Sequence, residues 1–204
     1  MIIVSIGKLL ISMKAPTDLI NISDIPTNIK KWKSLSEYNQ QWEFISNDSR
    51  YRISESLAAL DYFASIYDWL KPGLVFADVH KRMILILVAS IYECVLTDAI
   101  SRTARQELAE SKILKLFIKK DKINEIDNDE FESLINNGQQ IGMYRDDWKE
   151  YLHKIRGVRN WIHLSKNRDK NLEKWFNEQP IESFKSRLED FRKISEVYLS
   201  TIWA

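Results

Sequence analysis

The chain has 204 residues, of which 45% are hydrophobic and 29% charged, so it can bury one sizeable core but is short for two. Five glycines and four prolines are few for a sandwich or barrel, and the composition favours helices over strands and over disorder. Thirty Lys and Arg against 29 Asp and Glu leave a net charge of +1, which excludes a polybasic protein, so an anionic partner would be bound by a local cluster.

The first 48 residues carry no clear periodic pattern. Residues 1–13 are apolar but lack the basic n-region and the cleavage site of a secretion signal, so we interpret them as mature sequence. Residues 14–47 mix Pro, Asn, Ser and Trp, with room for a short helix near residues 37–46. We therefore divide the chain into an N-terminal extension, residues 1–48, whose structure the pattern does not predict, and a helical domain, residues 49–204.

Two long helices open the helical domain. Between residues 49 and 70, apolar residues recur at steps of three and four, which predicts an amphipathic helix that ends at Pro72-Gly73. The next helix is expected from Asp78, its N-cap, to about residue 103, and it is apolar around most of its circumference. This pattern is typical of a helix surrounded by other helices.

The second of these helices holds the longest apolar run of the chain, residues 83–89. This run is far short of the roughly 20 residues that a membrane span requires, so we expect a soluble protein with no membrane partner. Glu93 follows inside the same helix. A buried carboxylate costs several kcal/mol unless it is paired, so Glu93 should have an Arg, Lys or His partner.

Three further helices are predicted after an acidic break at residues 121–128, and residues 108–120 before the break also have a helical pattern. Their expected starts lie near Glu130, Asp146 and Pro180. The first is expected to have Asp127 and Glu130 as its capping residues and to end near Gly142, and a polar loop, residues 165–171, precedes the last. Because nothing alternates convincingly with period two, the sequence predicts an all-α protein.

Arg, Asn and His cluster on only one predicted helix, where residues 151–165 read YLHKIRGVRNWIHLS. At about 100° per residue, His163 lies two turns beyond Arg156 on nearly the same face, with Asn160 between them and Arg159 within reach of His163. A permanently charged guanidinium can hold a phosphodiester while an imidazole transfers a proton near neutral pH. This combination predicts RNA cleavage without a metal.

The charge around this segment is consistent with an anionic substrate. Residues 143–175 hold nine Lys or Arg and five acids, an excess of four, so the rest of the chain carries a net charge of about −3. Three tryptophans of the segment could stack on bases, although tryptophan in a bundle is more often part of the core: Trp148, Trp161 and Trp175. An Arg and a His seven residues apart also occur often by chance, on a solvated face or where an Arg caps a neighbouring helix.

The other candidate groups favour structural roles. Cys94 is the single cysteine, which excludes an internal disulfide and every zinc site built from several cysteines, and it fits a reducing compartment such as the cytoplasm. His153 is expected to be an exposed partner of Glu150, and His80 a first-turn residue without a role. No two histidines have a metal-ligand spacing, and the acidic run lacks the glycine of a calcium loop, so we expect neither a metal nor a cofactor.

The segment IRGVRNWIH resembles the motif of the HEPN superfamily of small helical-bundle proteins, in which an Arg, four to six residues and a His mark the active helix. Arg156 and His163 match this pattern, and Asn160 follows Arg159 in an Arg-Asn pair typical of the family. The resemblance covers roughly residues 78–203. It includes the helix with Glu93, which is similar to a central helix that often carries an acidic residue. Gly157, directly after the matched Arg, departs from the polar residue of many members, and it would mark a bend or a close helix approach at a dimer seam.

This resemblance implies an up-and-down bundle of four to five main helices that forms a homodimer and brings two motif helices into one cleft. Catalytic members are metal-independent endoribonucleases. For this chain that implies that His163 is the general acid or base, that Arg156 stabilises the charge on the phosphate as the 2′-OH attacks, and that Asn160 positions the substrate. The other expected RNA-binding residues are Arg159, Lys154 and Lys166.

The family also implies a biological setting. Many members act in toxin–antitoxin or antiviral defence systems, so an antitoxin or another operon-encoded protein is a possible partner. Other members have lost activity. The alternative function is therefore a non-catalytic helical module that binds a partner protein or a nucleotide.

Overall fold

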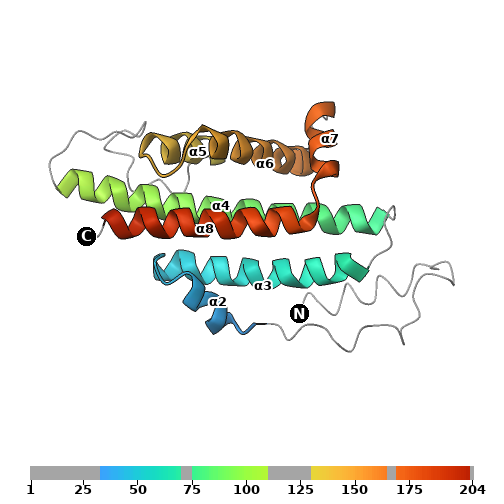
Figure 1. Ribbon diagram of the computed structural model, residues 1–204, viewed down its shortest axis with the longest axis horizontal. Coiled ribbons are helices and arrows are strands. Elements are labelled where there is room, and N and C mark those ends of the chain that lie inside the picture. The colour runs from blue at the N-terminus through green and yellow to red at the C-terminus, as the bar shows by residue number, and fades with distance from the viewer. Residues whose placement is uncertain (1–32, 70–74, 110–129, 165–168, 203–204) are drawn as a thin grey trace. The chain divides into compact units, whose positions relative to one another are not determined.

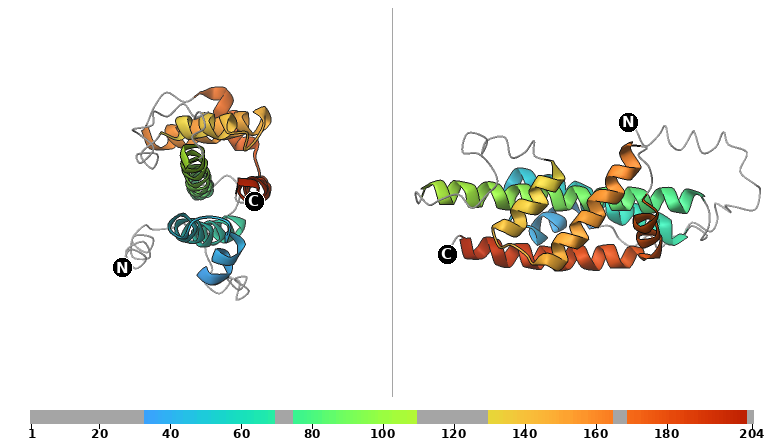
Figure 2. Two further views of the ribbon diagram at one scale, coloured as in Figure 1. Left: turned by 90° about the vertical axis from the view of Figure 1, so that its left-hand side faces the viewer. Right: turned by 90° about the horizontal axis from the view of Figure 1, so that it is seen from above.

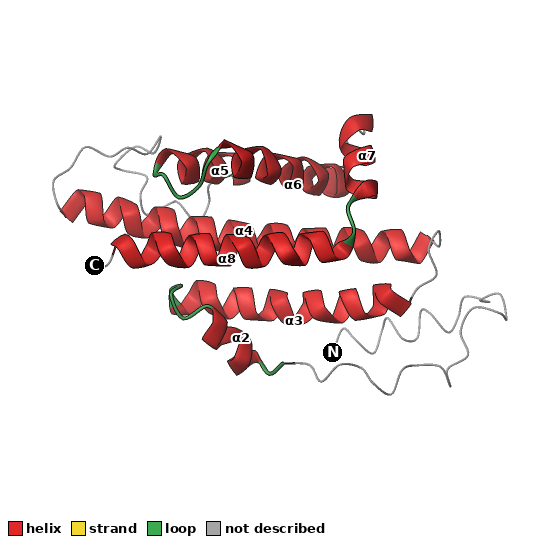
Figure 3. Cartoon of the chain, in the orientation of Figure 1, coloured by secondary structure: helices red, strands yellow, loops and turns green. Residues whose placement is uncertain are grey.

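The computed structural model describes residues 33–69, 75–109, 130–164 and 169–202 (Figure 1). Seven helices and no strands occur within these residues (Figure 3), which confirms the predicted all-α class. The helices are α2 (Leu35–Gln41), α3 (Asn47–Trp69), α4 (Val75–Ala109), α5 (Phe131–Gln140), α6 (Asp146–Leu164), α7 (Lys170–Glu178) and α8 (Ile181–Ile202). Lys33–Ala204 form one compact unit, to which α2 belongs.

α4 is the central helix of this unit. It packs against α3 on one side and against α5 and α6 on another, with α8 alongside it (Figure 2). The apolar pattern around its circumference explains this position, since side chains such as Leu85, Tyr92 and Ile100 are completely buried. Among the described helices, α4 is the one with a stretch long and apolar enough to cross a membrane, Ala77–Gln106. However, 61% of its apolar window is buried inside the structure, as in the core helix of a soluble protein.

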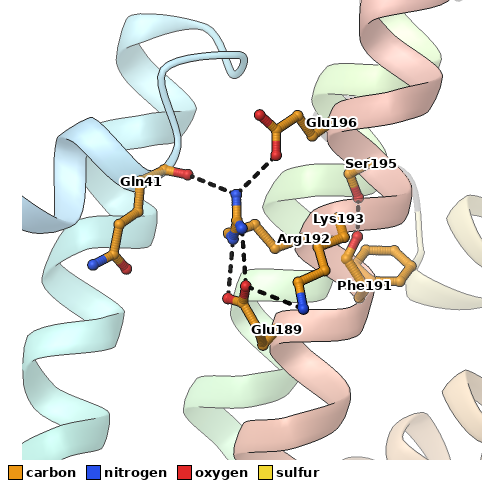
Figure 4. Close-up of polar contacts among 7 residues, drawn as sticks. All are labelled: Gln41, Glu189, Phe191, Arg192, Lys193, Ser195 and Glu196. Atoms are coloured by element: carbon orange, nitrogen blue, oxygen red, sulfur yellow. Dashed lines mark hydrogen bonds and ion pairs between the residues drawn. The ribbon is translucent and has the colours of Figure 1, made fainter.

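The last helix, α8, provides a second buried face and also contacts the end of α2. Phe191 contacts the ring of Tyr92 edge-on at 4.9 Å. On the other face, Arg192 donates hydrogen bonds to Glu189 at 2.9 and 3.0 Å, to Glu196 at 2.9 Å and to the carbonyl oxygen of Gln41 at 3.4 Å (Figure 4). The hydrogen bonds from Arg192 lower the pKa of Glu189, so this carboxylate remains charged.

Several predicted helix ends differ from the observed ones. α4 begins at Val75, so Asp78 lies in its first turn and is not the N-cap, because the helix already starts directly after the Pro72-Gly73 segment. Glu130 is the N-cap of α5, but its side chain makes no capping hydrogen bond. Asp127, the predicted loop residues 165–168 and most of the helical pattern at 108–120 lie outside the described residues.

One helix was missing from the prediction. α7 includes the last two residues of the predicted polar loop, residues 165–171, so the loop prediction is wrong at that end. Its N-cap is Asp169, whose carboxylate accepts hydrogen bonds from the backbone of Asn171 and Leu172. Phe176 buries the apolar side of α7 against Trp161 and Phe184. This contact positions α7 beside the helix that carries the motif.

Candidate functional site

The predicted motif lies in the second half of α6. The core-facing side of this helix is defined by completely buried residues, Leu152, Ile155 and Val158. At 100° per residue, a polar stripe runs along an adjoining side of the helix, and it contains Lys149, His153, Arg156, Asn160 and His163. The described side chains of this stripe are half-buried, because α5 packs against α6 and covers it in part.

Arg156 points toward α5 and forms an ion pair with Glu132 in its first turn. The side chain of Arg156 is 27% exposed and that of Glu132 is 49% exposed, so solvent reaches the pair. The hydrogen bond to Glu132 uses one Nη atom of the guanidinium, while the buried Nε has no hydrogen-bond partner within the described part of the chain. Since a guanidinium has five N–H donors, Arg156 retains donors for an anion from solvent.

Arg159 has a different environment. It forms an ion pair with Glu93 of α4, and its guanidinium lies over the ring of Phe131 at 5.8 Å. Glu93 is only 22% exposed, so this pair is more buried than the pair of Arg156. The partner predicted for Glu93 is therefore Arg159. Three helices, α4, α5 and α6, meet at this arginine.

His153 lies one turn before Arg156 and does not have the environment expected from the sequence. It is half-buried, and Glu150 instead pairs with Lys154 at 2.7 Å. Burial and the positive charges of Arg156 and Lys149 lower the pKa of His153, and Glu132 opposes them in part. Sequence reasoning missed this residue, although its spacing from Arg156 placed it on the same stripe.

The structure brings only some of the predicted site residues together. Asn160 lies half-buried one turn after Arg156, and His163 lies in the last turn of α6, about 10 Å along the axis from Arg156. The side chain of His163 and all of Lys166 lie outside the described residues. Lys154 is about 160° around the helix from Arg156, on a different side of α6.

Gly157 lies where α7 approaches α6. A Cβ atom at this position would lie 2.7 Å from Cδ2 of Leu172, closer than ordinary contact allows. Glycine therefore permits the close approach of a helix, as the sequence suggested, but here the neighbour is α7 of the same chain. α7 covers the side of α6 that carries Gly157, and the polar stripe lies on another side of α6.

The tryptophans of this segment belong to the core. Trp148 and Trp161 are buried, and Trp175 is half-buried against the rings of Tyr151 and Phe184. Base stacking on Trp148 or Trp161 would require the helices to separate.

No group of three or more His, Cys, Asp or Glu side chains within the described ranges is placed to hold a metal ion. No protein-family model, curated protein or solved structure matches the chain. The functional interpretation therefore depends on the stripe itself: a solvent-accessible guanidinium, a half-buried imidazole, an amide and a second histidine position on one side of α6.

Proposed function

We propose that the protein is a metal-independent endoribonuclease of HEPN type, in which Arg156 holds the scissile phosphate and His163 transfers a proton. The observation that carries this proposal is the common stripe on α6, on which Arg156, Asn160 and His163 succeed one another at one-turn steps. The partial exposure of Arg156 supports access of an anion to this stripe.

In the proposed reaction, the ribose 2′-oxygen forms a bond to phosphorus and loses its proton. The bond between phosphorus and the 5′-oxygen breaks, and the 5′-oxygen gains a proton, which gives a cyclic phosphate and a 5′-hydroxyl. Arg156 stabilises the extra negative charge on the phosphate oxygens. In a homodimer, one His163 from each protomer would supply the acid and the base.

The ion pair with Glu132 does not prevent this role of Arg156. Exposed ion pairs contribute about 0–1 kcal/mol, and both partners here are partly exposed. A phosphate can accept two parallel hydrogen bonds from one guanidinium, whereas Glu132 accepts one here. A bound phosphate can therefore displace Glu132, which until then holds the guanidinium on the correct side of α6.

The experiment that tests this function is cleavage of mixed RNA in excess EDTA by the parent protein and His163→Ala. The matched control is His80→Ala, which removes a histidine on α4 outside the stripe. We expect the parent and the control to give cyclic-phosphate ends, and His163→Ala to be slower by about 100-fold or more. Equal rates for His163→Ala and the parent would refute the assignment of His163.

A second function is favoured by one specific observation: both motif arginines, Arg156 and Arg159, are already paired with carboxylates of the chain. This arrangement suits a non-catalytic module that binds a nucleotide or a partner protein. It predicts binding without cleavage by the parent protein in the same assay. We place either function in the cytoplasm, in a toxin–antitoxin or antiviral defence system with an operon-encoded partner.

A further inference from the structure

A polar groove lies between α5 and α6, on the same side of α6 as the stripe. Its volume is about 460 Å³, within the range of sites for small molecules. The lining consists of hydroxyl, amide and ammonium groups from Ser133, Asn136, Asn137, Gln139, Gln140 and Lys149. This chemistry does not suit an apolar ligand, and a lining without a carboxylate does not suit a cation. It suits a ligand that has many hydrogen-bonding groups, with a negatively charged group near Lys149.

The amides of the groove are well matched to the edges of nucleobases. Each Asn or Gln side chain carries a donor and an acceptor in one plane, the pattern that reads paired donors and acceptors on a base. Asn136 and Gln140 are four residues apart, so they lie side by side on one face of α5. Lys149, from α6, adds a positive charge to this face.

The helix propensity of the residues also distinguishes the part of α5 that lines the groove. Asn136, Asn137 and Gly138 stand in the middle of a ten-residue helix, although all three residues favour helices poorly. Packing explains Gly138, because a Cβ there would lie 2.6 Å from the hydroxyl of Tyr144. Asn137 is buried, but Asn136 is half-exposed and faces the groove. Asn136 therefore lowers the stability of the helix at a position that lines the groove.

Lys149 is the lining residue that α6 contributes to the groove, and Arg156 lies further along the same stripe of this helix. Two contacts join α5 and α6, the hydrogen bond from Gln139 to Asp146 and the ion pair between Glu132 and Arg156. Along α6, Lys149 and Arg156 are two turns apart, about 10 Å, with His153 between them. A ligand in the groove at Lys149 would therefore be about two turns of α6 from a phosphate held by Arg156.

We propose that this groove binds the nucleotide next to the scissile phosphate of a single-stranded RNA, with Asn136 and Gln140 on the base edge and Lys149 on a phosphate. The inference rests on the proposed function, since Arg156 sets the position of the neighbouring phosphate. RNA that is not paired exposes its base edges to such amides, whereas a duplex hides them. The protein should accordingly discriminate among single-stranded sequences.

The test measures binding of fluorescein-labelled RNA octamers of adenylate, uridylate and cytidylate to the full chain in EDTA. The octamers carry 2′-O-methyl groups, because RNA without a free 2′-hydroxyl cannot be cleaved by this reaction. Gln140→Ala and Asn136→Ala should each raise the Kd for the preferred octamer at least fivefold and reduce the preference among octamers. Lys149→Ala should weaken binding to every octamer and reduce the salt slope by about 0.7. The matched controls, Gln40→Ala and Lys174→Ala, change exposed residues of other helices and should bind like the parent.

Three results would overturn the inference: no binding by the parent, unchanged preference in both amide variants, or equal competition by nucleoside monophosphates, which would indicate a site for a free nucleotide. The melting temperature of each variant checks folding, and Asn136→Ala should not lower it, because alanine favours the helix. The cleavage assay with His163→Ala is separate. Binding with the expected preference but without cleavage would support the groove and refute the proposed catalysis.

Discussion

Replacing Glu132 with Gln separates a ligand-binding role of Arg156 from a structural one. Glu132 is 49% exposed and forms its ion pair with a guanidinium that is 27% exposed. Loss of such a pair should lower the free energy of unfolding by no more than about 1 kcal/mol. The substitution also removes a negative charge next to the position of the bound phosphate.

The expected gain in affinity follows from that charge. A carboxylate about 5 Å from a phosphate repels it by roughly 0.8 kcal/mol in the high dielectric of an exposed site. Its removal should therefore lower the Kd for RNA about fourfold.

The assay is anisotropy of labelled 2′-O-methyl RNA, with urea unfolding of the same samples. Glu178→Gln is the control, since it makes the same charge change in the exposed ion pair with Lys174 on α7. The control should change the Kd by less than about twofold, because salt screens exposed charges. If Glu132→Gln binds RNA no better than the parent and loses more than about 2 kcal/mol of stability, Arg156 serves the packing of α5 on α6 and the reasoning is refuted.

Two further predictions concern pH and the second arginine. Burial and the charges of Arg156 and Lys149 lower the folded-state pKa of His153 below 6.5, so the unfolded chain binds its proton more readily and stability falls as the pH drops below about 6.5. The melting temperature of His153→Gln should fall less over this range than that of the parent, and an equal fall would contradict the environment described. Arg159→Ala should lower the free energy of unfolding by about 1–3 kcal/mol, since it leaves the half-buried Glu93 without its arginine. Adding Glu93→Gln should recover part of the loss in a double-mutant cycle measured by urea unfolding, and additive losses would count against this pair.

The sequence predicts those parts of the fold that depend on local patterns. The continuous apolar character of α4 indicated a central helix, and the acidic position inside it, Glu93, indicated that a charged partner would be found. α7 was missed because nine residues give a short periodic signal, and its stability depends on Phe176 packing between Trp161 and Phe184. Such contacts join side chains of different helices, and helical spacing does not reveal them.

The same limit applies to the candidate site. Spacing alone predicts that Arg156, Asn160 and His163 share one side of a helix, and α6 extends over all three positions. It did not reveal that α5 half-buries His153, because that burial depends on how the two helices pack. The amide groove was also missed, since it requires residues from α5 and α6 together.

The structure suggests how two nearby arginines of the motif divide their roles. Arg159 pairs with a carboxylate from the central helix and covers the ring of Phe131, so a ligand that displaced it would disturb three helices. Arg156 pairs with a more exposed carboxylate at the start of α5, next to the amide groove. In the proposed function, a phosphate would take the place of Glu132 and disturb only this surface contact, and the neighbouring nucleotide would then enter the groove. We infer that Arg159 maintains the bundle and Arg156 meets the ligand.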